Sequence, residues 1–224
     1  MANNPLDTFL LDRAIIFAVH AHAGTERRGK GFPYIVHPLE AVEIVSTMTS
    51  DQELLAAAAL HDTVEDTDVT VEQIRKEFGE RVANLVAAET DSNLGSQGCA
   101  GQPILPTKAG PLPFREPMSS RPASPGCSIE DDWRARKRAA IERLAKASHD
   151  AKIVALGDKL SNMRAIARDY AVKGDDLWKI FHATDPKDHE WHYRGLADAM
   201  KELSGTFAYQ EFERLINQVF NGSN

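Results

Sequence analysis

The strongest chemical signal in the sequence is the stretch HDTVEDTD, which begins at His61 and directly follows the apolar run ELLAAAAL. One histidine and four acids occupy these eight residues. On a helix, His61 and Glu65 are four residues apart, as are Asp62 and Asp66, so the side chains share one surface. Like charges at that spacing repel each other unless a cation lies among them, and imidazole and carboxylate are ligands for divalent metals. The stretch therefore predicts part of a metal site.

Two more residues can complete such a site. His37 directly precedes Pro38, and proline is favoured at the first position of a helix, so His37 is predicted to project from a helix start. Asp158 follows the apolar run KIVALG, so a segment that is predicted to be buried ends in one carboxylate. With His61 and Asp62 they form a two-histidine, two-aspartate set. Such a set suits manganese, iron or zinc and leaves coordination positions for water and substrate.

The elements that position these residues are predicted to be helices. Apolar residues recur at helical spacing through most of the chain, and the alternation typical of strands is absent. Thr70 and Gln73 form a capping box that opens a short helix to Phe78, and Gly79 ends it. The predicted fold class is all-α. The other expected helices lie at about 9–21, 37–48, 80–90, 131–147, 151–170, 187–203 and 206–220.

One segment does not fit a helical body. Between Ser92 and Ser128 the chain holds seven of its eleven prolines together with five glycines. Regular helices do not tolerate that density, and loops of this length are uncommon unless they are functional or disordered. We therefore predict a single domain over residues 1–224 that is interrupted by a flexible insertion at about 92–130. The insertion is interpreted as a lid, as a partner-binding arm or as a segment without a specific role.

Composition restricts the partners of the chain. The net charge is −7, from 33 acidic against 26 basic residues, so the chain as a whole repels nucleic acid and anionic membranes. No apolar run approaches the length of a transmembrane helix, and the N-terminal stretch lacks the pattern of a secretory signal, so the cytoplasm is the expected location.

A polyanionic substrate would need a local basic patch. Arg27, Arg28 and Lys30 place three cations within four residues of a glycine-containing loop. Such side chains bind phosphate groups through charge-assisted hydrogen bonds. The loop is predicted to bind substrate, and the alternative interpretation is a solvated turn.

Three separated motifs carry a resemblance to a known family: AVHAHAGTERRGKGFPYIVHP, AAALHDTVEDTDVT and KIVALGDKLSNMR. They are similar to the HD-domain superfamily of metal-dependent phosphohydrolases, and more closely to the hydrolase domain of RelA/SpoT-type proteins and the stand-alone small alarmone hydrolases. The resemblance covers about residues 8–91 and 131–205 and implies the HD-domain helical bundle. The chain is too short to add the synthetase and regulatory domains of the long relatives, so the implied activity is hydrolysis without synthesis.

The resemblance also implies a role for each part of the site. One divalent ion, typically Mn²⁺ in this family, is held by the two-histidine, two-aspartate set. Glu65 and Asp66 are associated with the hydrolytic water, Asn162 contacts the substrate, and the basic loop binds the nucleotide. The implied reaction removes pyrophosphate from the 3′ position of guanosine tetraphosphate or pentaphosphate and leaves GDP or GTP. Which of Glu65 and Asp66 acts as the base stays open, since either can orient the water or take its proton.

Two departures from the family pattern bear on the substrate. The basic loop is about one residue longer than the commonest pattern, so either Arg27 or Arg28 takes the place of the family arginine. Ala165 stands where related hydrolases often carry a hydroxyl residue. One alternative is therefore a phosphohydrolase for another nucleotide, such as an adenosine alarmone or NADPH. Another is a non-catalytic antitoxin that binds a partner. For the hydrolase, the expected role is to erase the alarmone, with a small alarmone synthetase toxin as a partner in the same pathway; the oligomeric state stays open.

Overall fold

The computed structural model describes residues 8–27, 30–90, 129–181 and 183–221, with the side chains of the helix that begins at Ile129 described from Trp133 onward. Within these ranges, all regular secondary structure is helical. The one β-type pairing among these residues is an isolated antiparallel bridge between Glu26 and Pro33. The predicted all-α class is confirmed. The predicted insertion at about 92–130 lies almost entirely outside the described residues.

The described helices fall into two groups along the chain. The first comprises α1 (Phe9–Ala21), α2 (Val36–Ser46), α3 (Gln52–Leu60), α4 (Thr63–Asp66), α5 (Val71–Phe78) and α6 (Glu80–Glu89). The second comprises α7 (Ile129–Ala145), α8 (His149–Lys173), α9 (Pro186–Ala199) and α10 (Phe207–Phe220), with short 3-10 helices η1 (Gly174–Ile180) and η2 (Lys201–Leu203).

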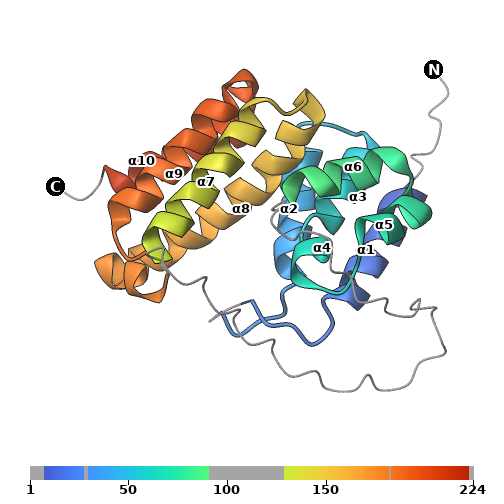
Figure 1. Ribbon diagram of the computed structural model, residues 1–224, viewed down its shortest axis with the longest axis horizontal. Coiled ribbons are helices and arrows are strands. Elements are labelled where there is room, and N and C mark those ends of the chain that lie inside the picture. Colours follow the sequence, from blue (N-terminus) through green and yellow to red (C-terminus); the bar gives the residue numbers. More distant parts are fainter. Residues whose placement is uncertain (1–7, 28–29, 91–128, 182, 222–224) are drawn as a thin grey trace.

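Helix α8 is the central element and joins the two groups (Figure 1). It packs against α2, α3 and α6 of the first group and against α10 of the second, while α7 packs on α9 and α9 on α10. Most residues from Ala151 to Ala167 of α8 are buried. A side chain in the middle of α8 can therefore meet side chains from both groups.

Local signals set several helix ends, and those of α5 are as predicted. The Thr70 hydroxyl accepts a hydrogen bond from the Gln73 backbone N–H at 3.2 Å, and the Gln73 side chain accepts one from the Thr70 backbone N–H at 2.8 Å. The predicted capping box is thereby confirmed. Gly79 ends this helix with a φ of +93°, a conformation that favours glycine. At the start of α8, the Ser148 hydroxyl accepts from the Ala151 N–H at 3.2 Å.

Several predicted helix ends are shifted in the structure. Helix α8 begins two residues earlier and ends three residues later than the predicted range 151–170. The helix predicted over 187–203 stops at Ala199, and its last turn is the 3-10 helix η2. A 3-10 turn is tighter than an α-helical turn. It lies just before Thr206, which caps the start of α10.

The HDTVEDTD stretch differs more clearly from the expectation of one continuous helix. Helix α3 ends at Leu60 and α4 begins at Thr63, so His61 and Asp62 lie in a turn between them. The Thr63 hydroxyl donates to the Leu60 carbonyl at 2.7 Å, and His61 Nδ1 lies 2.8 Å from the Ala58 carbonyl. Side chains thus satisfy backbone carbonyls that a continuous helix would have bonded, which allows the break.

Gly157 allows α2 and α8 to approach each other closely beside Asp158. A Cβ atom built on Gly157 would lie 2.6 Å from Val45 Cγ2 and 3.0 Å from the Ala41 carbonyl oxygen. Both neighbours are fully buried. The two helices that carry His37 and Asp158 therefore depend on the absence of a side chain here.

Gly157→Ala is expected to lower the free energy of unfolding by about 1–2 kcal/mol. Overpacking a core costs about 1–3 kcal/mol of stability, and a cost near 3 kcal/mol is expected here because the added Cβ meets a backbone oxygen. Replacing glycine by alanine within a helix stabilises it by roughly 1 kcal/mol, which offsets only a part of that cost. Urea unfolding measures the difference. Gly205→Ala is the control, because a Cβ at Gly205 meets nothing within 4 Å. Equal midpoints for Gly157→Ala and the wild type would contradict the close approach.

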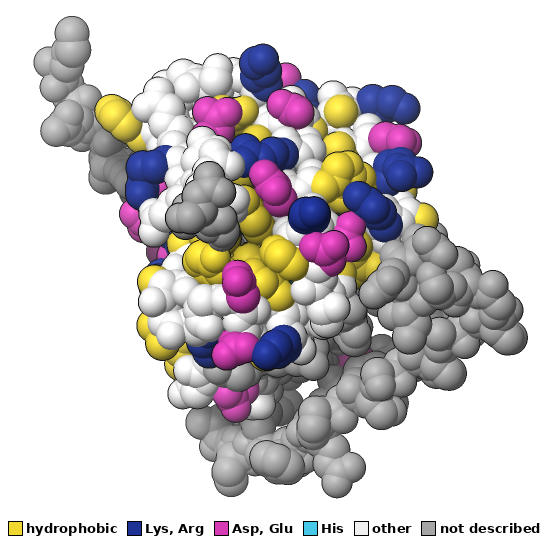
Figure 2. All heavy atoms as spheres, turned by 90° about the vertical axis from the view of Figure 1, so that its left-hand side faces the viewer, with side chains coloured by type: hydrophobic (Ala, Val, Ile, Leu, Met, Phe, Trp, Pro, Cys, Tyr) yellow, Lys and Arg dark blue, Asp and Glu magenta, His cyan; other side chains and the backbone are white. Residues whose placement is uncertain are grey.

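The surface on the side of α9 and α10 carries both signs of charge. Figure 2 shows acidic and basic side chains interspersed with apolar ones on this face. Charge therefore does not gather into a patch of one sign there. Among the described helices, none combines the length and the apolar character needed to span a membrane.

Candidate metal centre and its cavity

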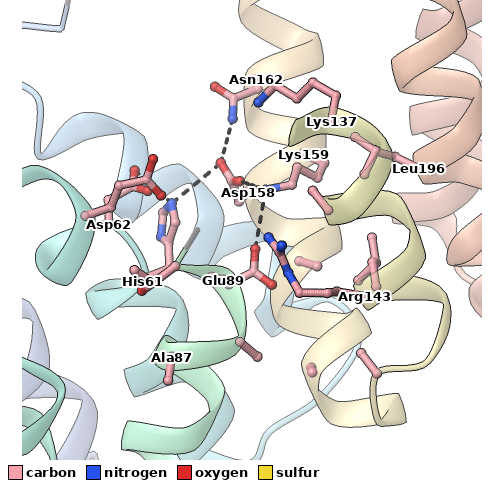
Figure 3. Close-up of a pocket in the computed structure, with 18 of the residues that line it drawn as sticks. His61, Asp62, Ala87, Glu89, Lys137, Arg143, Asp158, Lys159, Asn162 and Leu196 are labelled. Carbon is pink, nitrogen blue, oxygen red and sulfur yellow. Dashed lines mark hydrogen bonds and ion pairs between the residues drawn. The ribbon is translucent and has the colours of Figure 1, made fainter. Parts of the chain in front are cut away.

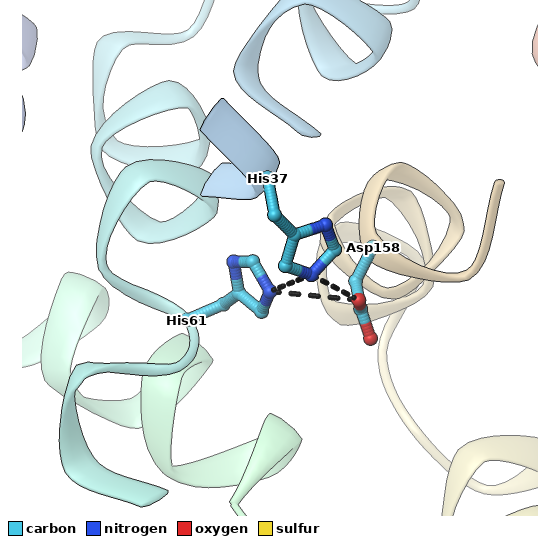
Figure 4. A group of neighbouring side chains, drawn as sticks. All are labelled: His37, His61 and Asp158. Carbon is cyan, nitrogen blue, oxygen red and sulfur yellow. Dashed lines mark hydrogen bonds and ion pairs between the residues drawn. The ribbon is translucent and has the colours of Figure 1, made fainter. Parts of the chain in front are cut away.

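Two imidazoles and a carboxylate from distant parts of the chain meet beside α8. His37 comes from α2, His61 from the turn after α3 and Asp158 from α8, and the three side chains point toward one another (Figure 4). The Nε2 atoms of His37 and His61 are 3.3 Å apart. Asp158 Oδ1 lies 3.0 Å from His37 Nε2 and 3.5 Å from His61 Nε2. All three residues are buried. The structure thus brings together residues that the sequence presents in three separate motifs.

Asp62 approaches the same two imidazoles. Its Oδ2 atom lies 3.0 Å from His61 Nε2 and 3.3 Å from His37 Nε2. The hydroxyl of Tyr34 donates a hydrogen bond to this same oxygen at 2.6 Å. Tyr34 was not predicted to belong to the site, although it is part of the PYIVHP motif that supplies His37.

These distances fit a divalent metal ion. Imidazole nitrogen and carboxylate oxygen bind such ions at about 2.0–2.2 Å, so two ligands of one ion stand roughly 3 to 3.5 Å apart. The separations between the imidazole nitrogens and the carboxylate oxygens are 3.0–3.5 Å. The donor set, two nitrogens and two carboxylates, is one that zinc, iron and manganese accept. His37, His61 and Asp158 each offer one atom within 4.8 Å of the others.

The electrostatics of the cluster also favour positive charge between the two aspartates. Burial raises the pKa of Asp62, but His61 and His37 lower it more, and the resulting pKa lies below its usual range. Burial likewise raises the pKa of Asp158, and Lys159 and the two imidazoles hold it well below the usual range. Burial lowers the pKa of His61, whereas the two aspartates raise it well above the usual value. Both carboxylates are thus ionised, the buried one of Asp158 and the partly buried one of Asp62. Positive charge at the imidazoles, at Lys159 or at a metal balances them.

The backbone orients His61. Its Nδ1 atom lies 2.8 Å from the carbonyl oxygen of Ala58. A carbonyl only accepts hydrogen bonds, so Nδ1 carries the proton and donates it. The opposite nitrogen, Nε2, is therefore the one turned toward His37 and the two aspartates, as a metal ligand must be.

The second oxygen of Asp158 is held by a partly buried ion pair that was not predicted from the sequence. Lys159 Nζ forms a very short contact with Asp158 Oδ2 and lies 3.3 Å from Glu89 Oε2. Asn162 Nδ2 donates to Asp158 Oδ1 at 2.6 Å. Burial raises the pKa of Glu89, with Asp158 adding to the rise and Lys159 opposing it. Lys159 directly follows Asp158 in the GDKLSN motif, whereas Glu89 is a single acid at a helix end with no local signal.

The cluster lies in the wall of a cavity of about 610 Å³ (Figure 3). Metal-centre residues line it on one side, and Lys137 and Arg143 from α7 line it on the other. Lys159 and His192 also contribute to the wall. A cavity with a cation-binding cluster facing basic side chains is suited to a molecule that carries several negative charges.

The predicted catalytic pair also reaches the cavity. Glu65 and Asp66 lie at the end of α4 and line the cavity. The break between α3 and α4 places them just beyond His61 and Asp62. Burial raises the pKa of Asp66, and the neighbouring Asp62 charge raises it further.

The predicted substrate-binding residues have different surroundings. Asn162 lines the cavity. Arg27 Nη2 donates to Asn162 Oδ1 at 2.8 Å, so Arg27 is joined to the cavity wall through Asn162. Lys30 pairs with Asp169 on α8 in a very short contact. Arg28 lies outside the described residues. The basic loop is therefore tied to α8 at two positions.

The family is shown by comparison with known proteins. The HD-domain family model matches residues 14–184. Together with an all-helical fold and a buried histidine–aspartate cluster, this match defines the class: the chain belongs to the HD-domain family.

Within that family, the similar proteins of comparable length are guanosine-3′,5′-bis(diphosphate) 3′-pyrophosphohydrolases of the MESH1 type. The mouse MESH1 protein is 30% identical over 207 residues, which cover 91% of this chain and 89% of that protein. The zebrafish protein is 32% identical over 168 residues, which cover 74% of this chain and 73% of that protein.

Longer relatives match only a part of the chain. A guanosine-3′,5′-bis(diphosphate) 3′-pyrophosphohydrolase of Aquifex aeolicus is 48% identical over 80 residues. This match covers 36% of the chain and 11% of that protein, and the chain spans about a tenth of the length of such long relatives. Among solved structures, a metazoan ortholog of SpoT aligns with a TM-score of 0.62 at 23% identity over 97% of this chain and 98% of its own. This similarity shows the same fold.

Proposed function

We propose that the chain is a metal-dependent phosphohydrolase that removes the 3′-pyrophosphate from guanosine tetraphosphate or pentaphosphate. The products are pyrophosphate and GDP or GTP. The observation that carries the proposal is the convergence of His37, His61, Asp62 and Asp158 at a cavity that is also lined by the basic side chains of Lys137 and Arg143. The names of the MESH1-type relatives, which match most of the chain, support the same reaction.

The proposed ligands of the metal are the two imidazole Nε2 atoms and the two aspartates. When bound, a divalent ion lowers the pKa of a water molecule and neutralises phosphate oxygens. We propose Mn²⁺ because imidazole and carboxylate ligands both suit it and because members of the resembled family typically use it. In the protein, Lys159 and Asn162 hold the carboxylate of Asp158, and the Tyr34 hydroxyl holds that of Asp62.

Glu65 and Asp66 are proposed to act on the attacking water. Their carboxylates line the cavity directly beyond the ligands, so one of them can orient the water and accept its proton. The substrate is proposed to contact Asn162 and the basic loop of Arg27, Arg28 and Lys30. Basic residues on the opposite wall neutralise the remaining phosphate charge.

The cellular setting is a further part of the proposal. The enzyme acts in the cytoplasm and degrades the alarmone that a small synthetase produces there. It thereby counteracts such a synthetase. The net charge of −7 agrees with a small anionic substrate that is recognised at a local basic site.

Pyrophosphate release from guanosine tetraphosphate tests the proposed function. We expect release in the presence of Mn²⁺, its loss on addition of a chelator and its return when excess Mn²⁺ is added. The same assay with an adenosine alarmone and with NADPH compares the alternative nucleotides. If folded, metal-loaded protein hydrolysed one of these alternatives and not guanosine tetraphosphate, the alternative nucleotide would be assigned as the substrate. No turnover of any nucleotide would reject the phosphohydrolase function.

A further inference from the structure

The second ring nitrogen of His37 is held by a chain of two side chains. His37 Nδ1 lies 2.8 Å from the Ser161 hydroxyl oxygen, and this hydroxyl donates to Glu40 Oε2 at 2.8 Å. Ser161 is fully buried on α8, and Glu40 is on α2, one turn beyond His37. Neither Ser161 nor Glu40 was predicted from the sequence to belong to the site.

The direction of these hydrogen bonds follows from the groups involved. An ionised carboxylate only accepts hydrogen bonds, so the single hydroxyl proton of Ser161 is directed to Glu40. The Ser161 oxygen must then accept a hydrogen bond from His37, which places a proton on Nδ1. The Nε2 atom, 3.0 Å from Asp158 Oδ1, is left to bind a metal through its lone pair.

Two arginines lie at the other end of this chain. Arg164 Nη1 is 3.5 Å and Arg168 Nη1 is 3.7 Å from Glu40 Oε1. Arg164 also forms a two-pronged ion pair with Glu211 of α10, at 2.7 and 2.9 Å. The carboxylate that orients Ser161 is therefore itself restrained by α8 and, through Arg164, by α10.

We infer that Ser161 and Glu40 are positioning residues for the metal centre and select the tautomer of His37 that turns its Nε2 lone pair toward the ion. The inference rests on the proposed role of His37 as a metal ligand. The two histidines differ in this respect, because His61 is oriented by the Ala58 backbone carbonyl, which a side-chain substitution cannot remove. Of the two imidazoles, His37 is therefore the one whose tautomer a side-chain substitution can change.

Zinc affinity tests the inference without relying on turnover. Zn²⁺ is the probe, and competition with a chromophoric chelator measures its dissociation constant. Ser161→Ala is expected to weaken zinc binding by about 10- to 100-fold, the usual effect of removing a partner of a ligating histidine. Ser148→Ala is the matched control on the same helix. It removes the N-cap of α8, which costs about 1 kcal/mol of stability, and is expected to leave zinc affinity unchanged.

Glu40 provides a second pair of variants, on a residue that is partly exposed. Glu40→Gln keeps an acceptor for the Ser161 hydroxyl and is expected to retain most of the zinc affinity. Glu40→Ala removes the acceptor and is expected to weaken binding in the same direction as Ser161→Ala. If Ser161→Ala does not fold, comparison of Glu40→Gln with Glu40→Ala tests the inference in its place. Equal zinc affinity for Glu40→Ala and the wild type would overturn the role of Glu40.

Nitrogen-15 NMR of the zinc-loaded protein reports the tautomer directly. In the wild type and in Ser148→Ala, His37 is expected to show a protonated Nδ1 that is protected from exchange and a metal-bound Nε2. In Ser161→Ala, the protected Nδ1–H signal is expected to disappear. A folded Ser161→Ala protein with wild-type zinc affinity and an unchanged Nδ1–H signal would overturn the inference.

The outcomes separate this inference from the proposed function. If the wild-type protein binds no zinc, His37 is not a ligand and the proposed metal chemistry fails with it. If the wild type binds zinc and releases pyrophosphate while Ser161→Ala behaves identically, the proposed function stands and only the positioning role is rejected.

Discussion

Asp62→Asn is expected to abolish pyrophosphate release, with a loss of roughly a thousandfold or more in kcat/KM. The substitution keeps the size of the side chain and an oxygen that can accept from Tyr34, but it removes one of the two negative charges beside the imidazoles. A metal contributes several kcal/mol to stabilising phosphoryl charge, and each 1.4 kcal/mol corresponds to about tenfold in rate. Steady-state kinetics measure the loss in kcat/KM, and the metal content of the same sample shows whether the loss comes with loss of the metal.

Asp68→Asn is the matched control for this variant. Asp68 is an exposed acid of the same HDTVEDTD stretch and does not line the cavity. Its substitution removes the same charge from the chain and is expected to leave metal content and kcat/KM close to wild type. Wild-type activity in Asp62→Asn with the metal still bound would remove Asp62 from the proposed ligand set.

Substitutions of the acidic pair are expected to separate catalysis from metal binding. One of the variants Glu65→Gln and Asp66→Asn removes the residue that takes the proton from water. That variant should lower kcat by about 10²- to 10⁴-fold, which is the usual contribution of a general base. Metal content should stay at the wild-type level, because neither carboxylate belongs to the proposed ligand set. The larger loss of kcat identifies the base, and the smaller loss identifies a residue that orients the water.

The pH dependence of kcat provides a check on this assignment. The variant that lacks the base should lose the acidic limb of the profile, whereas the variant that lacks the orienting residue should keep it. Asp68→Asn again serves as the control for charge. If Glu65→Gln and Asp66→Asn both retained wild-type kcat, the proton acceptor would have to be sought among other residues that line the cavity.

Much of the fold was predictable because helix signals are local. The capping box at Thr70 and Gln73 involves residues within one turn, and the structure contains it as predicted. Apolar spacing likewise identified the main helices, since a stripe of apolar residues must face the core. The break between α3 and α4 was not predicted, because it depends on how the His61 ring and the Thr63 hydroxyl bond to carbonyls of the preceding turn.

The sequence by itself determined the helices, the candidate ligands and the order of the motifs. Only the tertiary structure decided what surrounds them. Lys159 and Glu89 are 70 residues apart in the chain, and Ser161 and Glu40 are 121 apart. Their contacts depend on the packing of α8 against α6 and α2, and no spacing rule along one helix encodes such packing. Residue types therefore indicate a metal site, while helix packing selects the side chains that orient its ligands.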